Sequence, residues 1–240
     1  APETSYISIH APIGNNFRYG TSTSVPEGGG SNPNNRSYLQ NYMASEPHHG
    51  VGFTAVSDKA GPISRTDVNL NYAYHIGITE QINVSLGVAA GVSKIFLDRS
   101  QLVLENPADQ AIGTGNFNQL KPDLSAGIWL YGPRYFAGVS AQQLLKSPMG
   151  FSDDPVTYDQ GRKVSHLFAT LGYKVYLGDD FAAIPSALLK VVSPVPMSVD
   201  VNLKLAYKDR FWVGGSYRKD DAFAGMAGFN LGSFMNIGYS

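Results

Sequence analysis

The sequence contains no cysteine among its 240 residues, and charged residues make up only 15% of it. Without cysteine, disulfide bonds and thiolate metal sites are excluded. The formal net charge of −1 gives no basic field that would attract nucleic acid or anionic lipid. The composition therefore argues against a nucleic-acid-binding protein and against a disulfide-stapled secreted domain.

Long apolar runs are also missing, since no stretch reaches the roughly 18 residues that a spanning helix needs. The mean hydropathy of −0.14 would suit a soluble protein. Neither the length of apolar runs nor the mean hydropathy detects a β-barrel, because every second residue of its strands can face a polar lumen. The 26 glycines, 14 tyrosines and 12 phenylalanines, with so few charges, suit a barrel wall better than a soluble surface.

Alternation with a period of two residues is the strongest pattern in the chain. Apolar side chains alternate with polar or small ones along 66–76, 82–93 and 197–207, and each run is about as long as a strand that crosses a bilayer. We predict strands near 4–13, 48–58, 66–76, 82–97, 121–131, 135–143, 163–177, 181–192, 197–207, 211–218, 221–230 and 234–240.

A soluble β-sandwich would also alternate, but two features favour a barrel. The non-apolar positions are rich in Gly, Ser, Asn and Ala rather than in Lys and Glu. Aromatic residues also gather beside the expected tight turns, where an interfacial girdle belongs. The girdle predicted on this basis comprises Tyr74, Tyr131, Tyr135, Tyr176, Phe181, Tyr207, Phe211 and Trp212.

Connection lengths orient the expected barrel. Short connections at 77–81, 132–134, 178–180, 208–210 and 231–233 alternate with others that include the long 98–120 and 144–162. Short turns are periplasmic in bacterial barrels, so the first strand descends from outside and the last ascends. A barrel that starts and ends in the periplasm then needs one more strand at each end, which brings the twelve predicted strands to about fourteen. The predicted fold is an all-β, antiparallel, up-and-down transmembrane barrel.

The whole chain, 1–240, is expected to form one barrel domain with an insertion at 14–47 on the short-turn side. This segment is either a flexible surface insertion or a periplasmic docking element, with a possible short helix at 38–44. Ala1 opens no signal peptide. Since a barrel must be exported, we expect that a signal was cleaved or that the sequence starts inside the protein.

The alternation also assigns side chains to the two faces of the wall. We expect lipid contact at Leu70, Tyr72, Val84, Leu86, Val201 and Leu203. Ser85 and a set of polar residues should face the lumen, where charges of mixed sign satisfy one another. This set consists of Asp67, Asn69, Asn71, Asp200, Asn202, Lys204 and Arg218. Pro185 falls inside a predicted strand, so a bulge or local fray is expected there.

A search for chemistry finds no phosphate-binding loop, no His-Glu-x-x-His motif and no zinc cluster. The pairs Asp153-Asp154, Asp179-Asp180 and Asp220-Asp221 lie at predicted turns and match no calcium-loop spacing. Ser165, His166 and Asp200 could be drawn as a hydrolase triad, but no local signature supports that choice. We therefore expect no catalytic residue, no metal site and no cofactor.

Three groups of segments carry a resemblance to a known family. They are His49–Phe53, Asp58–Arg65 and Val68–His75; Pro122–Ile128, Tyr135–Ser140 and Gln143–Leu145; and Pro185–Lys190, Val199–Asn202, Tyr207–Gly214 and Ser216–Arg218. From about residue 48 to the end, the chain resembles the PorP/SprF family, outer-membrane proteins of the type IX secretion and gliding machinery of Bacteroidota. The family pattern usually extends beyond both ends of this sequence, and its first hairpin is tighter than 14–47.

The resemblance implies a non-enzymatic accessory role in exporting large, adhesin-like surface proteins. Partners would be outer-membrane lipid, the C-terminal sorting domain of a secreted protein, and translocon or periplasmic components. A general diffusion channel is the alternative, and a barrel hydrolase is a third hypothesis.

The expected partner-binding surface is the connection that carries Asp58, Lys59, Gly61, Pro62 and Arg65. A proline-fixed loop loses little entropy on binding, and Arg65 can form charge-assisted hydrogen bonds. Alternatively, Arg65 and Asp67 only brace the loop on the barrel rim.

Overall fold

The computed structural model describes residues 3–13, 43–98, 117–145, 148–149, 161–162, 164–178, 180–208, 210–219, 221–231 and 235–239. These residues form strands and turns, and no helix among them is long and apolar enough to cross a membrane. The strands are β1 Glu3–Ile13, β2 His48–Ala60, β3 Ile63–Gly77, β4 Asn83–Leu97, β5 Phe117–Tyr131, β6 Tyr135–Gln142, β7 Pro148–Met149, β8 Gly161–Arg162, β9 His166–Tyr173, β10 Val175–Leu177, β11 Phe181–Val192, β12 Val195–Tyr207, β13 Phe211–Arg218, β14 Ala222–Leu231 and β15 Met235–Tyr239.

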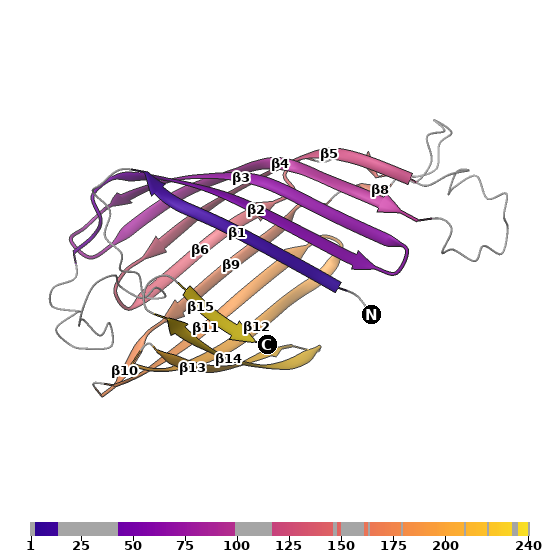
Figure 1. Ribbon diagram of the computed structural model, residues 1–240. Coiled ribbons are helices and arrows are strands. Elements are labelled where there is room, and N and C mark those ends of the chain that lie inside the picture. Colours follow the sequence, from indigo (N-terminus) through magenta and orange to yellow (C-terminus); the bar gives the residue numbers. More distant parts are fainter. Residues whose placement is uncertain are drawn as a thin grey trace.

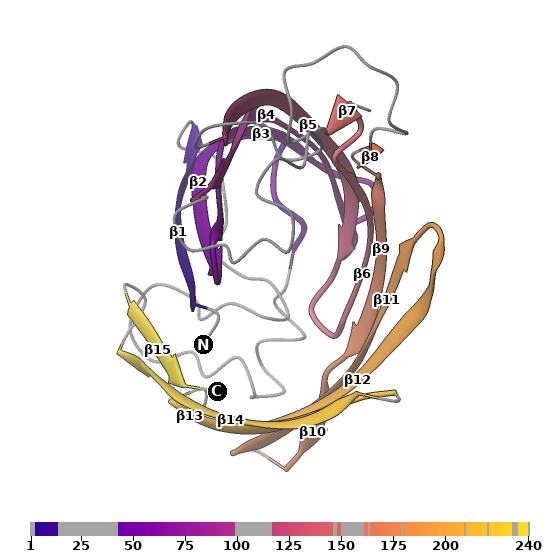
Figure 2. The same cartoon turned by 90° about the vertical axis from the view of Figure 1, so that its right-hand side faces the viewer.

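One 13-stranded sheet contains all of these strands except β7 and β8, which pair with each other. Its strands follow one another in chain order and every pairing is antiparallel, as the up-and-down prediction requires (Figure 1). The sheet curls until its edge strands β1 and β15 face each other (Figure 2). Within the described residues these two strands do not pair, so the closing strands remain a prediction.

The two faces of the curved sheet differ in burial. Asn83, Ser93, Asp123, Tyr131 and Ile184 are all buried, and the register places them on the same face. Large apolar side chains such as those of Leu70 and Val201 lie on the other face and are exposed. Because side chains crowd together on the inside of a curved sheet, the buried face is the concave one. The convex face is apolar and has the pattern of a wall in contact with lipid.

The convex face carries an aromatic band at the short-turn end. Its members are Tyr74 of β3 and, on the successive strands from β6 to β14, Tyr135, Tyr173, Phe181, Tyr207, Phe211 and Phe229. Three residues of the predicted girdle, Tyr131, Tyr176 and Trp212, lie instead on the concave face. That part of the prediction is wrong, because closeness to a turn says nothing about which face a side chain occupies.

Aromatic rings on the concave face cover glycines of the next strand. A Cβ added at Gly138 would collide with the Trp129 ring, and one at Gly172 would collide with the Phe136 ring. The Trp129 and Phe136 rings are stacked with centroids 5.4 Å apart. Together with Tyr131 and Ile184 they form a hydrophobic cluster inside the curve. Glycine is needed at these positions because the ring occupies the space of a side chain.

The ladder is interrupted beside Pro185, as predicted. Pro185 keeps its register with Leu203 of β12. On the other side, the pairing of β11 with β9 ends at Ser186 and resumes with β10 at Ala183. The predicted strand 163–177 is therefore divided into β9 and β10. A register shift between β11 and β12 lies further along, between Lys190 and Val192.

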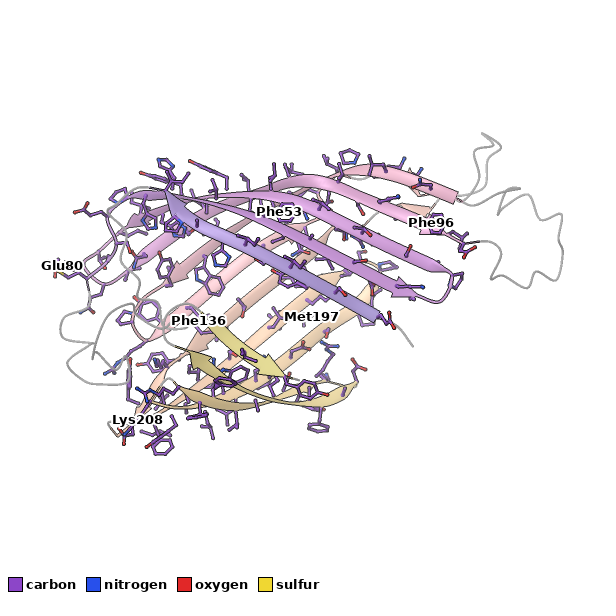
Figure 3. All side chains as sticks on the ribbon, viewed as in Figure 1. Phe53, Glu80, Phe96, Phe136, Met197 and Lys208 are labelled. Carbon is purple, nitrogen blue, oxygen red and sulfur yellow. The ribbon has the colours of Figure 1, made fainter. Side chains whose placement is uncertain are left out.

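The predicted insertion 14–47 lies mostly outside the described residues, as does most of the possible helix at 38–44. Both strands that flank it meet at the short-turn end, where Ile13 pairs with His49. Residues 43–47 are described and pack against the β3–β4 turn. The Ala44 amide donates to the Glu80 carbonyl, at 2.7 Å, and the Ser45 amide donates to Asn83 Oδ1, at 2.9 Å. Figure 3 shows Glu80 and Lys208 at this end and Phe96 at the opposite one.

Candidate functional site

The expected partner-binding connection is the tip of a long β-hairpin rather than an open loop. Strands β2 and β3 stay paired as far as Ala60 and Ile63, leaving Gly61 and Pro62 as a two-residue turn. Gly61 has φ of 59°, in the left-handed region that glycine adopts without strain. Asp58 therefore lies inside the ladder, opposite Arg65, and accepts a hydrogen bond from Thr4 Oγ1 of β1 at 2.9 Å. The tip is held within the sheet, because Lys59 still pairs with Glu3 of β1, Ile63 pairs with Leu97 of β4, and the Pro62 carbonyl accepts from the Asp98 amide at 2.8 Å.

Arg65 points along the concave face instead of outward from the tip. Its guanidinium forms an ion pair with Asp67, with 2.9 Å between Nη2 and Oδ2 and 3.1 Å between Nε and Oδ1. With its amide oriented to satisfy both of its ends, Gln143 accepts from Arg65 Nη2 at 2.7 Å and donates to the Val164 carbonyl. The brace between Arg65 and Asp67, which we considered as the alternative to partner binding, is therefore present. Exposed groups at the tip are Lys59, Ala60, Gly61 and Ile63.

The polar residues expected in the lumen share the concave face. Asp67, Asn69 and Asn71 occupy alternate positions of β3, and Asn71 Nδ2 donates to Thr54 Oγ1 of β2 at 3.4 Å. Asp200, Asn202 and Lys204 lie on β12, and their direct partners across the ladder are Arg218, Ser216 and Gly214 of β13. The two sets are far apart in the sheet, separated by the strands from β4 to β11.

Arg218 of β13 and Lys204 of β12 make different kinds of contact on this face. Arg218 binds Asp200 through two contacts, 2.9 Å from Nε to Oδ1 and 3.1 Å from Nη2 to Oδ2, and its Nη1 reaches Asp221 at 3.1 Å. Lys204 Nζ lies 4.4 Å from the centre of the Trp212 ring, within the range of a cation–π interaction. The Arg218 contacts are those of a mixed-sign ladder, in which neighbouring charges satisfy one another.

At the β12–β13 turn, outside the strands, Lys208 lies near two partners. A hydrogen bond to Tyr207 and the nearby Asp180 carboxylate raise the pKa of Lys208. Its Nζ is 3.6 Å from Asp180 Oδ2, and both side chains are exposed. The ammonium therefore stays charged at neutral pH and ties two adjacent short turns together only weakly.

Several contacts were missed by reasoning from the sequence. His48 of β2 and His75 of β3 stack with centroids 4.6 Å apart, and His75 Nδ1 lies 3.1 Å from the Tyr131 hydroxyl. The register places His48 on the concave face, opposite His75. Parity could have placed His75 on the same face as Asp67, because both are odd-numbered positions of β3, and His48 is the residue opposite His75. The contact between Gln143 and Arg65 had no signal in the periodicity of the sequence.

The residues weighed for catalysis are engaged elsewhere. Ser165 Oγ donates to the Gln143 carbonyl at 3.1 Å, and the Asp200 carboxylate accepts from Arg218. In the part of the chain that the structure describes, no three His, Asp or Glu side chains gather in a way that could hold a metal ion. Asp153 and Asp154 lie outside the described residues, as do Asp179 and Asp220 of the other two acidic pairs.

No curated protein and no solved structure matches the sequence significantly. A family model does match it, and that model is described as the type IX secretion system membrane protein PorP/SprF. The match covers residues 1–240, the full length of the chain, and the all-β antiparallel sheet agrees with an outer-membrane barrel. The chain therefore belongs to the PorP/SprF family of outer-membrane proteins of the type IX secretion system.

Proposed function

We propose that this protein holds the C-terminal domain of a secreted cargo protein, or couples that domain to the translocon, without doing chemistry. The cargo would be a large, adhesin-like surface protein. The proposal rests on membership of a type IX secretion family over the whole chain. The β2–β3 tip, with Asp58, Lys59, Gly61, Pro62 and Arg65 at or just below it, is the proposed contact surface.

The stiffness of the hairpin is the observation that supports this surface. Ala60 and Ile63 are still paired next to the Gly61-Pro62 turn, and Arg65 is fixed from below by Asp67 and Gln143. A surface that is ordered before binding loses less conformational entropy in the complex. In this arrangement Arg65 and Asp67 act as the support, while Lys59 and Ile63 make the contact.

A general diffusion channel has less support from the geometry. Arg65 starts from β3 and Gln143 follows β6, yet their side chains meet although β4 and β5 lie between those strands. Ile95 and Leu97, on the same concave face, are buried at this end. The long-loop end of this sector is thus filled by side chains, which would obstruct an open aqueous path.

Gene deletion tests the function, and a charge reversal tests the surface. Deletion should abolish surface display of one large cargo and leave most other secretion intact. Lys59→Glu should reproduce this loss, because it reverses the charge of the tip; it also sets a carboxylate opposite Glu3 of β1, so the abundance of the variant must be compared with that of the unaltered protein. Display is measured by antibody labelling of intact cells, with barrel abundance checked in the same membranes.

Lys219→Glu is the matched control. Lys219 is an exposed lysine at the β13–β14 turn, at the same end of the sheet but distant from β2 in the strand order. It should leave display unchanged. Normal display after gene deletion would refute the proposed function, whereas normal display in Lys59→Glu alone would refute only the proposed surface.

A further inference from the structure

The convex face of the sheet changes from apolar to polar at one corner. On β6 and on the strands from β9 to β15, its described positions carry apolar or aromatic residues or glycine. At the long-loop end of β1 to β4, the same face becomes polar in two neighbouring rows of directly paired residues. These rows, named here the polar corner, are Ser5, Ser57, Thr66 and Lys94, and beside them Glu3, Lys59 and Ser64.

The height of the polar corner above the aromatic band matches the edge of a membrane. Thr66 and Tyr74 lie eight residues apart on the convex side of β3. This spacing is about 27 Å along the strand, and a tilt of about 40° makes it about 20 Å across the membrane. Because the apolar band of such a barrel is about 25 Å tall, Thr66 and its neighbour Lys94 lie at the level of lipid headgroups. Figure 3 marks this end of the strands with Phe96, the residue opposite Ser64.

The long-loop end has a different interface elsewhere on the wall. On β13 and β14 the rings of Tyr217 and Phe223 lie against each other with centroids 4.7 Å apart, and both are exposed on the convex face. Such rings are the usual contact of a barrel with the membrane interface. Hydroxyl groups and lysines replace the rings at the polar corner, so this corner offers a different set of partners to the membrane surface.

We propose that the polar corner binds the phosphorylated sugar headgroup of a glycolipid in the adjacent membrane leaflet. Lys94 is exposed and can donate charge-assisted hydrogen bonds to a phosphate. Its neighbour across the ladder is Thr66, which in turn pairs with Ser57. The two hydroxyl groups can both donate to and accept from the hydroxyls of a sugar ring.

The apolar wall below the polar corner identifies the ligand as a lipid. The next row of the convex face toward the short-turn end consists of Ile7, Ala55, Val68 and Val92, in register with the hydroxyl row. A ligand on this part of the wall therefore meets apolar residues along one half of its length and polar residues along the other. A glycolipid has this division, with acyl chains and headgroup in line. A protein would first have to displace lipid from the continuous apolar face.

Charge at the polar corner favours an anionic headgroup over a zwitterionic one. Lys59 and Lys94 carry two positive charges, and Glu3, which pairs with Lys59, carries one negative charge, so the seven residues have a net charge of 2 − 1 = +1. Lys94 lies between Thr66 and Leu120, one row away from Glu3 and Lys59. The lysine that would bind the phosphate is thus separate from the lysine of the proposed cargo contact.

The proposal goes beyond the cargo role, and its test needs no cargo protein. The purified full chain is released from detergent micelles and titrated with diphosphorylated lipid A in native mass spectrometry. The comparison lipids are lipid A from which both phosphates have been removed, and phosphatidylethanolamine. The affinity for diphosphorylated lipid A should exceed that for either comparison lipid by about fivefold or more, because hydrogen bonds between ions are stronger than neutral ones.

Substitutions then assign the contacts. Lys94→Gln should weaken the binding of diphosphorylated lipid A by about fivefold, whereas Lys94→Arg, which keeps the charge, should retain it. Thr66→Val keeps the size and the charge of the side chain, and should weaken binding by about twofold because it removes one hydroxyl group. Lys219→Gln is the matched control, since Lys219 is an exposed lysine at the same end of the sheet but beside the aromatic pair.

The control variant should change the affinity by less than about twofold, because charges farther apart than a Debye length are screened. Equal affinity for diphosphorylated lipid A and phosphatidylethanolamine, or equal losses in the Lys94→Gln and Lys219→Gln variants, would overturn the proposal. Equal affinity for the two forms of lipid A would overturn the contact between Lys94 and phosphate. If Lys94→Gln does not fold, the comparison of the three lipids on the unaltered protein decides. None of these results changes the expectation for cargo display, so the two proposals can fail separately.

Discussion

At the scale of single residues, neighbours along a strand meet different surroundings. Val201 lies on the convex face of β12 with 53% of its surface exposed, whereas Asn202 lies on the concave face and pairs with Ser186 of β11. In a bilayer the convex position contacts hydrocarbon, and the concave position has polar neighbours. A one-residue slip in register would exchange the two, so the cost of a charge at each position measures the register directly.

Arginine at Val201 should destabilise the folded protein by about 2–4 kcal/mol, the cost of that side chain near the middle of the membrane. Arginine at Asn202 should cost clearly less, because the guanidinium can remain among polar groups. The measurement is urea-induced unfolding in phospholipid vesicles. Equal destabilisation by Val201→Arg and Asn202→Arg would contradict the assignment of the faces.

Parity explains which residues of the wall could be predicted from the sequence and which could not. Leu70 and Asn71 follow the two-residue period, and the structure places them on opposite faces. Tyr131 was assigned to the interfacial girdle because it adjoins a turn, yet it has the parity of Asp123 and is buried on the concave face. An aromatic residue beside a turn can cover a glycine on the inside as readily as it meets the interface on the outside. Closeness to a turn therefore cannot replace parity.

At the scale of the strand, two prolines inside the sheet differ in the direction of the missing N–H. The Lys174 amide donates to the Arg134 carbonyl, on the β6 side of β9. The preceding residue, Tyr173, therefore directs its backbone N–H and C=O to the other side, toward Pro185 of β11. Successive residues of a strand direct their backbone groups to opposite neighbours. Pro185 thus leaves the Tyr173 carbonyl without its ladder donor, which accounts for the break between β9 and β10.

Pro122 of β5 is the opposite case. Leu124, two residues along, accepts through its carbonyl from the Leu144 amide, so Pro122 also directs its backbone away from β4. The pairing of β5 with β6 begins only at Ala126. Among the described residues, therefore, no strand of the ladder lies where an N–H of residue 122 would point.

Pro185→Val should leave the protein about 1 kcal/mol more stable than Pro122→Val does, because it restores one ladder hydrogen bond to Tyr173. The same change at Pro122 should restore no such bond. Both variants remove a proline that restricts the backbone of the unfolded chain, so this effect on stability is the same in both. The difference between their free energies of unfolding therefore measures the hydrogen bond. The free energy of unfolding in vesicles is again the measure. An equal effect of the two substitutions would show that the break beside Pro185 has another cause.

At the scale of the whole molecule, contacts between distant strands are the part that the sequence did not reveal. Strand order and faces follow from local periodicity, because each strand pairs with its neighbour in the chain. The contact between Arg65 and Gln143 depends on how strongly the sheet curves and on the positive φ of Gln143, at 57°. Neither property has a signature in the periodicity, so the Arg65–Gln143 contact and the crowded long-loop end could not be predicted.

Orientation in the membrane is the property of the whole molecule that remains a prediction, and the absence of cysteine makes it directly testable. Single cysteines can be placed at Glu80, on the β3–β4 turn, and at Ala60, on the β2–β3 tip, at opposite ends of the sheet. Both side chains are exposed, so each thiol should be accessible on its own side of the membrane.

With the short turns in the periplasm, Ala60→Cys should react with a membrane-impermeant maleimide in intact cells, and Glu80→Cys should react only after the outer membrane is opened. Ser31→Cys, in the segment between β1 and β2, should behave like Glu80→Cys, because both flanking strands end at the short-turn end. Labelling is measured by a mass shift of the purified protein. Reaction of Glu80→Cys in intact cells together with protection of Ala60→Cys would reverse the topology, and would place the β2–β3 tip in the periplasm, where it could not hold a cargo domain at the cell surface.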